Sequence, residues 1–474
     1  MIENIKTDAP LVAALERLNG RTSFHMPGHK GREDALMLHA YMDATELNVT
    51  DDLYRATGAI DSAQNLMAHS ARAAHTIFLT NGSTCGVESM LGYAACPGER
   101  VILPRASHLS AVSACALYGI EPIWVDAWAD DAGAPYTREE DVLKAIAENP
   151  DARAVLMTRP DYFGRMVRLK EIARAAHERG MLLLIDEAHG AHLNWMDGDT
   201  CVYRPDGSNG DACVSALSQG ADICVESAHK TLPALTGGAY LNMGEGIDKD
   251  RLLSRVALTQ SSSPSFLIMA SLDSARAYMD ACGKAELTRV AGECERIYDM
   301  CSSLDMRPAR EYFNADCDRT RLALDVTARG ITGFEAQQAL TDCGVDIEMA
   351  DEYRIVMICS PMDDECKFKL LRDALRKLPR GAKAFPERTQ MRVPRGRREM
   401  SIRQAALGQI ERVPLKKAKG RIAARALGAY PPGVAACVPG EEITPEISDW
   451  LIEAQRAGAE LFGMEKGMCA VARI

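Results

Sequence analysis

Short apolar runs alternate with helical stretches between about residues 75 and 245, and this alternation constrains the fold more than any other feature of the chain. The pattern is typical of a mostly parallel sheet that is covered by helices. We expect strands at 76–79, 100–103, 122–125, 154–158, 182–185, 223–225 and 238–242. The predicted fold class is therefore α/β.

Polar or glycine residues follow most of these apolar runs directly. They are Asn81-Gly82-Ser83-Thr84, His108, Tyr162, Asp186-Glu187 and Ser227-Ala228-His229-Lys230. In open α/β sheets, ligands bind beyond the carboxyl ends of the strands. We therefore expect these turns to converge on one binding site.

The rest of the chain divides into smaller units. A connecting helix is expected near 271–304, and 320–378 mixes strand and helix patterns as a smaller α/β domain would. The domains that we predict are an N-terminal arm at 1–50, a large domain at 51–275, a small α/β domain at 276–378, a linker at 379–399 and a C-terminal domain at 400–474.

The segment 376–398 is strongly basic, with nine basic residues and the single acid Glu387. A nucleic-acid patch is one interpretation and an exposed linker is the other. Three prolines interrupt the segment, and Phe385 alone offers an aromatic ring for stacking on a base. The formal net charge of −11 also argues against nucleic acid. We therefore interpret the segment as a linker and expect no nucleic-acid partner.

The bulk composition indicates a soluble protein of the reducing cytoplasm. No run of about 18 uncharged apolar residues occurs, so we expect no membrane span. The 15 cysteines are scattered singly, which does not suggest a disulfide framework. The pairs His25/His29 and His189/His192 lack the carboxylate or thiolate at fixed spacing that a metal site usually adds. We therefore expect no metal.

Lys230 follows a predicted strand and a short polar turn that contains Ser227 and His229. A lysine in such a place is commonly only a solvated cation. The alternative is a lysine that holds pyridoxal 5′-phosphate (PLP) as a Schiff base. That chemistry needs an amine that can be neutral, a phosphate cradle, and an acid that keeps the pyridinium nitrogen charged.

Two other turns offer the cradle and the acid. In 81–86, glycines let the backbone approach a phosphate, and Ser83 and Thr84 open a possible helix whose N-terminus attracts anions. Asp186 ends an apolar run, where a buried carboxylate needs a partner such as a pyridinium nitrogen. A common loop and a helix-capping Asp are the alternatives. The three turns together predict a PLP enzyme.

Several motifs, taken in order, resemble the bacterial ornithine/lysine/arginine decarboxylase family, which has the aspartate-aminotransferase-like fold of PLP enzymes (fold type I). Three carry most of the resemblance: Phe24-His-Met-Pro-Gly-His-Lys30, Asp186-Glu-Ala-His-Gly190 and Ser227-Ala-His-Lys230. Shorter agreements are Asp51-Asp-Leu53, Asn81-Gly-Ser-Thr84, Ser261-Ser-Ser-Pro-Ser-Phe266, Tyr430-Pro-Pro-Gly433 and Pro439-Gly-Glu441. The early position of the first motif implies the short type, without the receiver-like wing domain of larger members.

The resemblance implies roles for particular residues. Lys230 would form the Schiff base, Asp186 would hold the pyridinium nitrogen, and His108 and Ala188 would lie on opposite faces of the ring. The other cofactor residues would be Ser83, Thr84, Ser227 and His229 around the phosphate, His189, and Ser262 or Ser261, reaching the phosphate of a neighbouring subunit. A homodimer or higher oligomer with shared sites is therefore expected. Leu109 and Phe266 depart from the lysine and tyrosine that are common in the family.

The implied reaction is decarboxylation of a basic amino acid, with His229 or Lys230 returning a proton to the α-carbon. The candidates for binding the distal cation of the substrate are Glu441, Asp51 and Glu348, although a glutamate in a proline-glycine turn is also commonly just exposed. Arginine, lysine and ornithine all fit; the short type favours arginine. The physiological role would be polyamine biosynthesis or acid resistance.

Other reactions stay open, because fold does not dictate function. An aminotransferase would hold the substrate carboxylate with an arginine of the small domain, for which Arg319, Arg321 and Arg354 are candidates. Another PLP lyase and a PLP-binding protein without turnover are the remaining alternatives.

Overall fold

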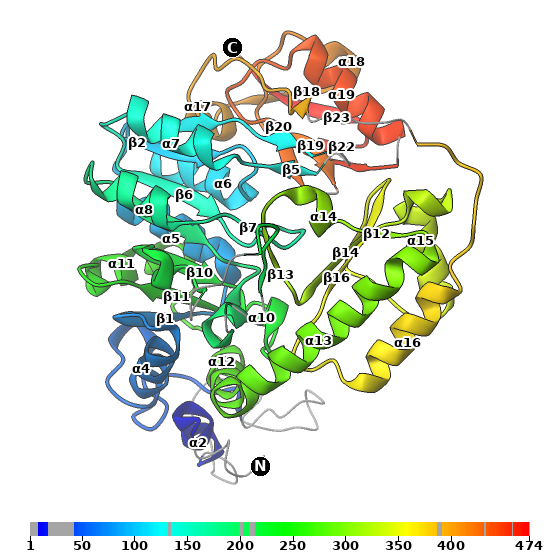
Figure 1. Cartoon of the computed structure of the whole chain (residues 1–474). Helices are drawn as coiled ribbons and strands as arrows, with labels where there is room; N and C mark the ends of the chain where they lie inside the picture. The colour runs from blue at the N-terminus through cyan, green and yellow to red at the C-terminus, as the bar shows by residue number, and fades with distance from the viewer. Residues whose placement is uncertain are drawn as a thin grey trace.

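The computed structural model describes residues 8–17, 42–130, 134–196, 198, 202–207, 214–385, 391–430, 433–456 and 458–473. The motif at 24–30, with His25 and His29, lies outside the described residues, and so do Pro431 and Pro432. Figure 1 shows a large sheet domain on the left, a smaller domain on the right and the C-terminal region at the top. The domain boundaries drawn from the sequence stay a proposal.

A seven-stranded sheet forms the centre of the large domain, in the order β1-β11-β10-β8-β6-β2-β3. The strands are β1 (His75–Leu79), β2 (Arg100–Pro104), β3 (Glu121–Val125), β6 (Ala154–Thr158), β8 (Leu182–Asp186), β10 (Ile223–Glu226) and β11 (Ala239–Met243). All seven predicted strands are confirmed, each end within one residue. Only β11 runs against its neighbours β1 and β10; the other pairs are parallel.

Helices cover both faces of this sheet. On one face lie α5 (Gly82–Ala94), α6 (Leu109–Tyr118) and α11 (Lys249–Thr259), and on the other α7 (Glu139–Glu148) and α8 (Lys170–His177). Within β2, Val101 and Leu103 join the first core and Ile102 joins the second, as side chains that alternate across a strand must. Strands buried on both faces read as continuous apolar runs, which is why the sequence reveals them.

Three helices cover the end of the sheet near β1: α2 (Pro10–Glu16), α4 (Ala59–Ala71) and α12 (Phe266–Tyr278). The fully buried Leu11 and Leu15 pack α2 into this group. The backbone N–H of Leu11 donates to Asp273 Oδ2 at 2.9 Å. The start of the described chain is therefore anchored to the large domain.

The small domain follows α12 through a π-helical turn at Met279–Gly283. Its sheet has the order β12-β14-β16-β15. The elements are α13 (Lys284–Cys301), β12 (Arg307–Pro308), β14 (Arg321–Asp325), α15 (Gly333–Asp342), β15 (Met349–Ala350), β16 (Arg354–Ile358) and α16 (Glu365–Arg376). The helix expected near 271–304 is thus two helices, α12 and α13. A capping box between Thr332 and Glu335 begins α15.

The C-terminal region builds two three-stranded sheets, β18-β23-β22 and β20-β19-β21, around its own apolar core. Its elements are α17 (Ile402–Leu407), β18 (Ile410–Pro414), α18 (Leu415–Ala418), β19 (Leu427–Tyr430), β20 (Val434–Cys437), α19 (Pro445–Arg456), β21 (Glu460–Phe462), β22 (Met464–Glu465) and β23 (Met468–Ala472). In Figure 1 this region lies above the large domain and beside β5 (Pro135–Tyr136).

The basic segment before the C-terminal region runs along the large domain. Its strand β17 (Met391–Arg392) pairs with β4 (Trp128–Ala129). Its arginines meet acids of the same chain: Arg392 and Arg395 pair with Asp126, Arg398 with Glu121, Arg397 with Glu399, and Arg380 with Asp305. These five charges are thus compensated within the chain, and the linker interpretation stays a prediction.

Two bulk features of the described residues are plain. None of the described helices has both the length and the apolar character that crossing a bilayer demands. The cysteines in the described part of the chain are free thiols.

Candidate active site

A cavity of about 1130 Å³ lies beyond the carboxyl ends of the central strands. Residues that end or follow β1, β2, β6, β8 and β10 line it, so the predicted turns do converge on one place. Nine of the predicted cofactor residues are in its wall: Ser83, Thr84, His108, Asp186, Ala188, His189, Ser227, His229 and Lys230. Ser262 is exposed and lies outside this wall in the single chain.

The N-terminus of α5 forms one end of the cavity. Gly82, with φ +73°, turns the chain from β1 into the helix, and Gly86 lets α5 approach Val225 of β10 so closely that a Cβ would lie 2.4 Å from that side chain. The backbone N–H of Gly82 donates to the carbonyl oxygen of Gly237 at 2.8 Å. The N-cap residue Asn81 makes no side-chain cap, so the next N–H groups, those of Ser83 and Thr84, can bind an anion. Ser227 Oγ lies 2.8 Å from Ser83 Oγ. This end can hold a phosphate.

Asp186 is the last residue of β8 and is 4% exposed. One of its oxygens, Oδ1, accepts the backbone N–H of Ala188 at 3.1 Å. No other hydrogen bond to its carboxylate is found among the described residues. A buried carboxylate with spare acceptor capacity at a cavity wall needs a donor from a ligand.

Lys230 lies in the short helix α10 (Ala228–Thr231), which follows β10. Its Nζ is 3.2 Å from Nε2 of His189. Burial lowers the pKa of Lys230, and the nearby charge of Asp186 opposes that effect only in part. The environment therefore favours the neutral amine more than water does.

Other polar groups of the cavity wall face the same space. His108 caps α6, because its Nδ1 accepts the backbone N–H of Ser110 at 3.2 Å. His229 Nδ1 lies 2.9 Å from the carbonyl oxygen of Gly238, which can only accept, so this nitrogen carries the hydrogen. The hydroxyls of Ser107 and Thr158 are buried in the wall without a hydrogen-bond partner.

The set of groups fits PLP. It combines an anion-binding helix N-terminus with two serine hydroxyls, a buried carboxylate with an unused acceptor, an amine of lowered pKa, and buried hydroxyls that still need partners. The phosphate, the ring nitrogen and the aldehyde of this cofactor would satisfy the first three. Ser107 and Thr158 were not predicted as site residues from the sequence, although Ser107 closely follows β2 and Thr158 ends β6.

The three predicted substrate carboxylates lie outside the cavity wall of the single chain. The sequence offered Glu441 as a ligand of the distal cation of the substrate, with an exposed turn residue as the alternative. It is 3% exposed and forms a two-pronged ion pair with Arg105, each contact at 3.0 Å. Its charge is thus neutralised inside the fold. Glu348 accepts the hydroxyl of Tyr162, and Tyr162 lines the cavity. Of the three, Glu348 is linked most directly to the site.

Asp51 binds backbone N–H groups at the start of α4. It accepts backbone N–H groups before and at the start of α4, including that of Gly58 at 2.7 Å. Although burial alone would raise the pKa of Asp51, these backbone hydrogen bonds lower it. The carboxylate therefore acts as a cap for α4 in this chain.

The arginines considered for an aminotransferase are engaged elsewhere. Arg354 pairs with Asp130 and Asp351, and Arg319 pairs with Glu295. Arg321 donates to the carbonyl oxygen of Tyr162 and to His189. None of the three lines the described cavity. Among the described residues, these three arginines therefore do not reach the cavity as a clamp for a substrate carboxylate would.

His189 and His192 are close in the sequence, but their side chains lie in different environments. His192 Nε2 lies 2.9 Å from Asp318 Oδ2, and both side chains are buried. His189 instead contacts Lys230 and the ring edge of Tyr162, with ring centroids 5.0 Å apart. The two rings therefore face different partners.

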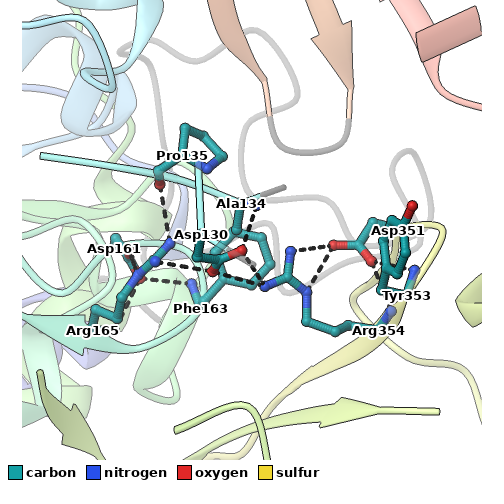
Figure 2. Close-up of polar contacts among 9 residues, drawn as sticks. All are labelled: Asp130, Ala134, Pro135, Asp161, Phe163, Arg165, Asp351, Tyr353 and Arg354. Carbon is teal, nitrogen blue, oxygen red and sulfur yellow. Dashed lines mark hydrogen bonds and ion pairs between the residues drawn. The ribbon is translucent and has the colours of Figure 1, made fainter. Parts of the chain in front are cut away.

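A buried ion network joins the cavity wall to the small domain (Figure 2). Asp130 lies between two arginines: Arg165 Nη1 is 3.1 Å and Arg354 Nη1 is 3.0 Å from its Oδ2. Arg165 also contacts Asp161, and Arg354 also contacts Asp351. The ring of Phe163 lies between the guanidinium groups. Since these residues are far apart in sequence, no local motif signals the network.

Replacing Asp130 by asparagine is expected to lower the free energy of unfolding by about 2 kcal/mol. Both arginines keep one carboxylate partner, but they lose the charge that they share across the domain boundary. Urea denaturation measures the change. Asp151→Asn is the matched control, because Asp151 pairs with Arg100 at the surface with its side chain 60% exposed, and surface pairs contribute about 0.5 kcal/mol. Equal changes in both variants would contradict a special role of Asp130.

The chain matches models of two domains that belong to one protein family. Residues 9–315 match the family model of the Orn/Lys/Arg decarboxylase major domain, and 384–473 match that of the C-terminal domain. Arginine decarboxylase of Bacillus subtilis is 30% identical over 98% of this chain and 98% of its own. Arginine decarboxylase of Halalkalibacterium halodurans is 31% identical over 93% and 92%.

Solved structures share the fold at low identity. The constitutive lysine decarboxylase of E. coli superposes with a TM-score of 0.80 at 17% identity, covering 100% of this chain and 82% of that one. A structure of SPT with PLP superposes with a TM-score of 0.53 at 16% identity, over 78% and 84%. These likenesses establish the PLP enzyme fold, with a mostly parallel central sheet.

Proposed function

Because this chain belongs to the Orn/Lys/Arg decarboxylase family, we propose that it removes the α-carboxylate of arginine as carbon dioxide and releases agmatine. The chain is a PLP-dependent amino-acid decarboxylase. The choice of arginine over lysine and ornithine rests on the full-length relatives. The main observation that supports the proposal is that Lys230, Asp186 and the N-terminus of α5 line one cavity.

In this proposal each part of the cofactor has a protein partner. The first turn of α5, with Ser83, Thr84, Ser227 and His229, holds the phosphate. Asp186 keeps the ring nitrogen protonated, and His108 and Ala188 enclose the ring. Lys230 holds the aldehyde covalently. When bound, PLP supplies an electron sink for the electron pair left at the α-carbon.

The protein's own contribution is orientation and proton transfer. The walls of the cavity would orient the α-carboxylate of the substrate for its loss, and burial would keep water away from the reacting carbon. Lys230 and His229 remain the two candidates for returning a proton to that carbon. The distal guanidinium would be bound near Tyr162, whose hydroxyl is held by Glu348.

The proposal extends to assembly and cellular role. The exposed Ser262 would reach the phosphate of a neighbouring subunit, which makes a homodimer the smallest complete unit. Agmatine is a precursor of the kind that polyamine biosynthesis requires, and we place the enzyme in the cytoplasm.

A product assay tests the reaction and the substrate together. The PLP-loaded protein is incubated with arginine, lysine or ornithine, and carbon dioxide, agmatine, cadaverine, putrescine and keto acids are measured. We expect carbon dioxide and agmatine in equal amounts, and a kcat/KM for arginine at least about 10-fold above the others. Keto acid without carbon dioxide would favour an aminotransferase. Cofactor binding without any product would favour a binding protein.

A further inference from the structure

Arg321, the first residue of β14, is a buried arginine of the small domain that reaches into the large domain. Its side chain is 2% exposed. Its Nη1 donates to the carbonyl oxygen of Tyr162 at 3.1 Å, and its Nη2 lies 3.4 Å from Nδ1 of His189. Neither acceptor is a carboxylate. The second contact places Arg321 one residue behind Lys230, because the other ring nitrogen of His189 faces the lysine.

The chemistry of these groups fixes where the hydrogens lie. A guanidinium has only donors, so Nδ1 of His189 must accept and carries no hydrogen. The ring then carries its hydrogen on Nε2, since a ring without either hydrogen would be an imidazolate. Nε2–H therefore donates to Lys230 Nζ at 3.2 Å. An ammonium group has no lone pair with which to accept, so the lysine in this arrangement is a neutral amine.

We infer that Arg321 is a positioning residue which, by fixing the tautomer of His189, holds Lys230 in its neutral form. The inference rests on the proposed role of Lys230 as the lysine that binds the cofactor. Only the neutral amine has the lone pair that can form a bond to the aldehyde carbon, and the aldehyde oxygen then leaves as water. The step needs no oxidant or reductant.

The charges around His189 agree with this arrangement. The groups that face the ring or lie near it are Lys230 on α10, Arg321 on β14, His108 at the start of α6, His192 in the 3-10 helix Ala191–Trp195, and Tyr162 after β6. Burial lowers the pKa of His189 well below its usual value, and the charge of Arg321 lowers it further, as a charge on Lys230 also would. Asp186 and Glu348 oppose the lowering of the Lys230 pKa, while burial and Arg321 favour it.

The tautomer can be observed directly in the cofactor-free protein. Nitrogen-15 NMR of labelled histidine separates the two neutral tautomers and the cation, and a His189→Gln variant identifies the signal of His189. We expect a neutral ring with hydrogen on Nε2 at pH 7. A cationic ring, or hydrogen on Nδ1, would overturn the inference without any change at Arg321. Neither result depends on the substrate, so a failed product assay leaves this test intact.

Arg321→Met tests the cause. The pKa of Lys230 is read from the pH dependence of its acetylation by acetic anhydride, followed by mass spectrometry of the peptide that contains it. We expect the pKa to rise by about one unit, which lowers the rate of acetylation near neutral pH by about 10-fold. Arg319→Met is the matched control. Arg319 lies two positions before Arg321 in the sequence but pairs with Glu295, so its replacement should leave the pKa of Lys230 unchanged.

The double variant separates the hydrogen bond from plain charge repulsion. In a His189→Gln background, Arg321→Met should raise the pKa of Lys230 by clearly less than in the native background. An equal rise in both backgrounds would mean that Arg321 acts by charge alone and would overturn the inference. If Arg321→Met does not fold, the tautomer of the native protein decides the question.

Discussion

Replacing Lys230 by alanine is expected to lower decarboxylation by at least about a thousand-fold and to abolish the visible absorption of the bound cofactor. The amine is the group of the cavity wall that can bond covalently to an aldehyde, and its pKa is already lowered by burial. Release of carbon dioxide and the absorption spectrum of the PLP-loaded protein measure the two effects separately.

Lys230→Arg is the matched control for charge. Arginine keeps a cation in the same place but does not deprotonate in proteins, so it should be as inactive as alanine. Lys144→Ala is the control for losing a lysine in general, because Lys144 is 70% exposed and pairs with Glu148 on the surface of α7. A Lys230→Ala protein that retained both activity and colour would refute the proposed site.

Replacing Asp186 by asparagine is expected to lower kcat by about a hundred- to a thousand-fold, with a much smaller change in KM. The amide oxygen can still accept the N–H of Ala188, so the local structure should persist. What is lost is the negative charge that holds a proton on the ring nitrogen, and with it the ability of the ring to accept electrons. Steady-state kinetics over a range of substrate concentrations separates the two constants.

Asp222→Asn provides the comparison for Asp186. Asp222 directly precedes the central strand β10, at the opposite end of the strands from the cavity, where its carboxylate accepts the backbone N–H of Leu183 at 2.7 Å. The same substitution there should leave kcat within about two-fold. If Asp186→Asn also stayed within that range, some other group would have to hold the ring nitrogen.

The sequence predicts the large sheet well because its strands are buried on both faces and therefore appear as continuous apolar runs. It also predicts nine residues of the cavity wall, among which Ser83, Asp186, Ser227 and Lys230 lie at or just after the ends of those runs. Both signals are local: a few neighbouring residues carry them. The fold of the large domain is therefore predictable from the sequence, while the roles of these residues toward the cofactor stay a prediction.

The rest depends on contacts between distant parts of the chain. No residue near Glu441 in the sequence indicates that Arg105 is its partner. From the proline-glycine turn alone, Glu441 could therefore be an exposed acid. Asp130, Arg165 and Arg354 meet for the same reason without a motif. The contact of Arg321 with His189 joins two domains and became visible only in three dimensions.

The buried pair of Arg105 and Glu441 has a consequence for how such a chain can be divided. Arg105 stands two residues before Ser107 and three before His108, at the rim of the cofactor cavity, while its partner belongs to the C-terminal region. Removing the C-terminal region would leave the guanidinium of Arg105 without its carboxylate partner beside the cavity wall. The two regions are also joined by apolar contacts, because Ile402, Ala435 and Val438 of the C-terminal region belong to the same buried core as the large domain.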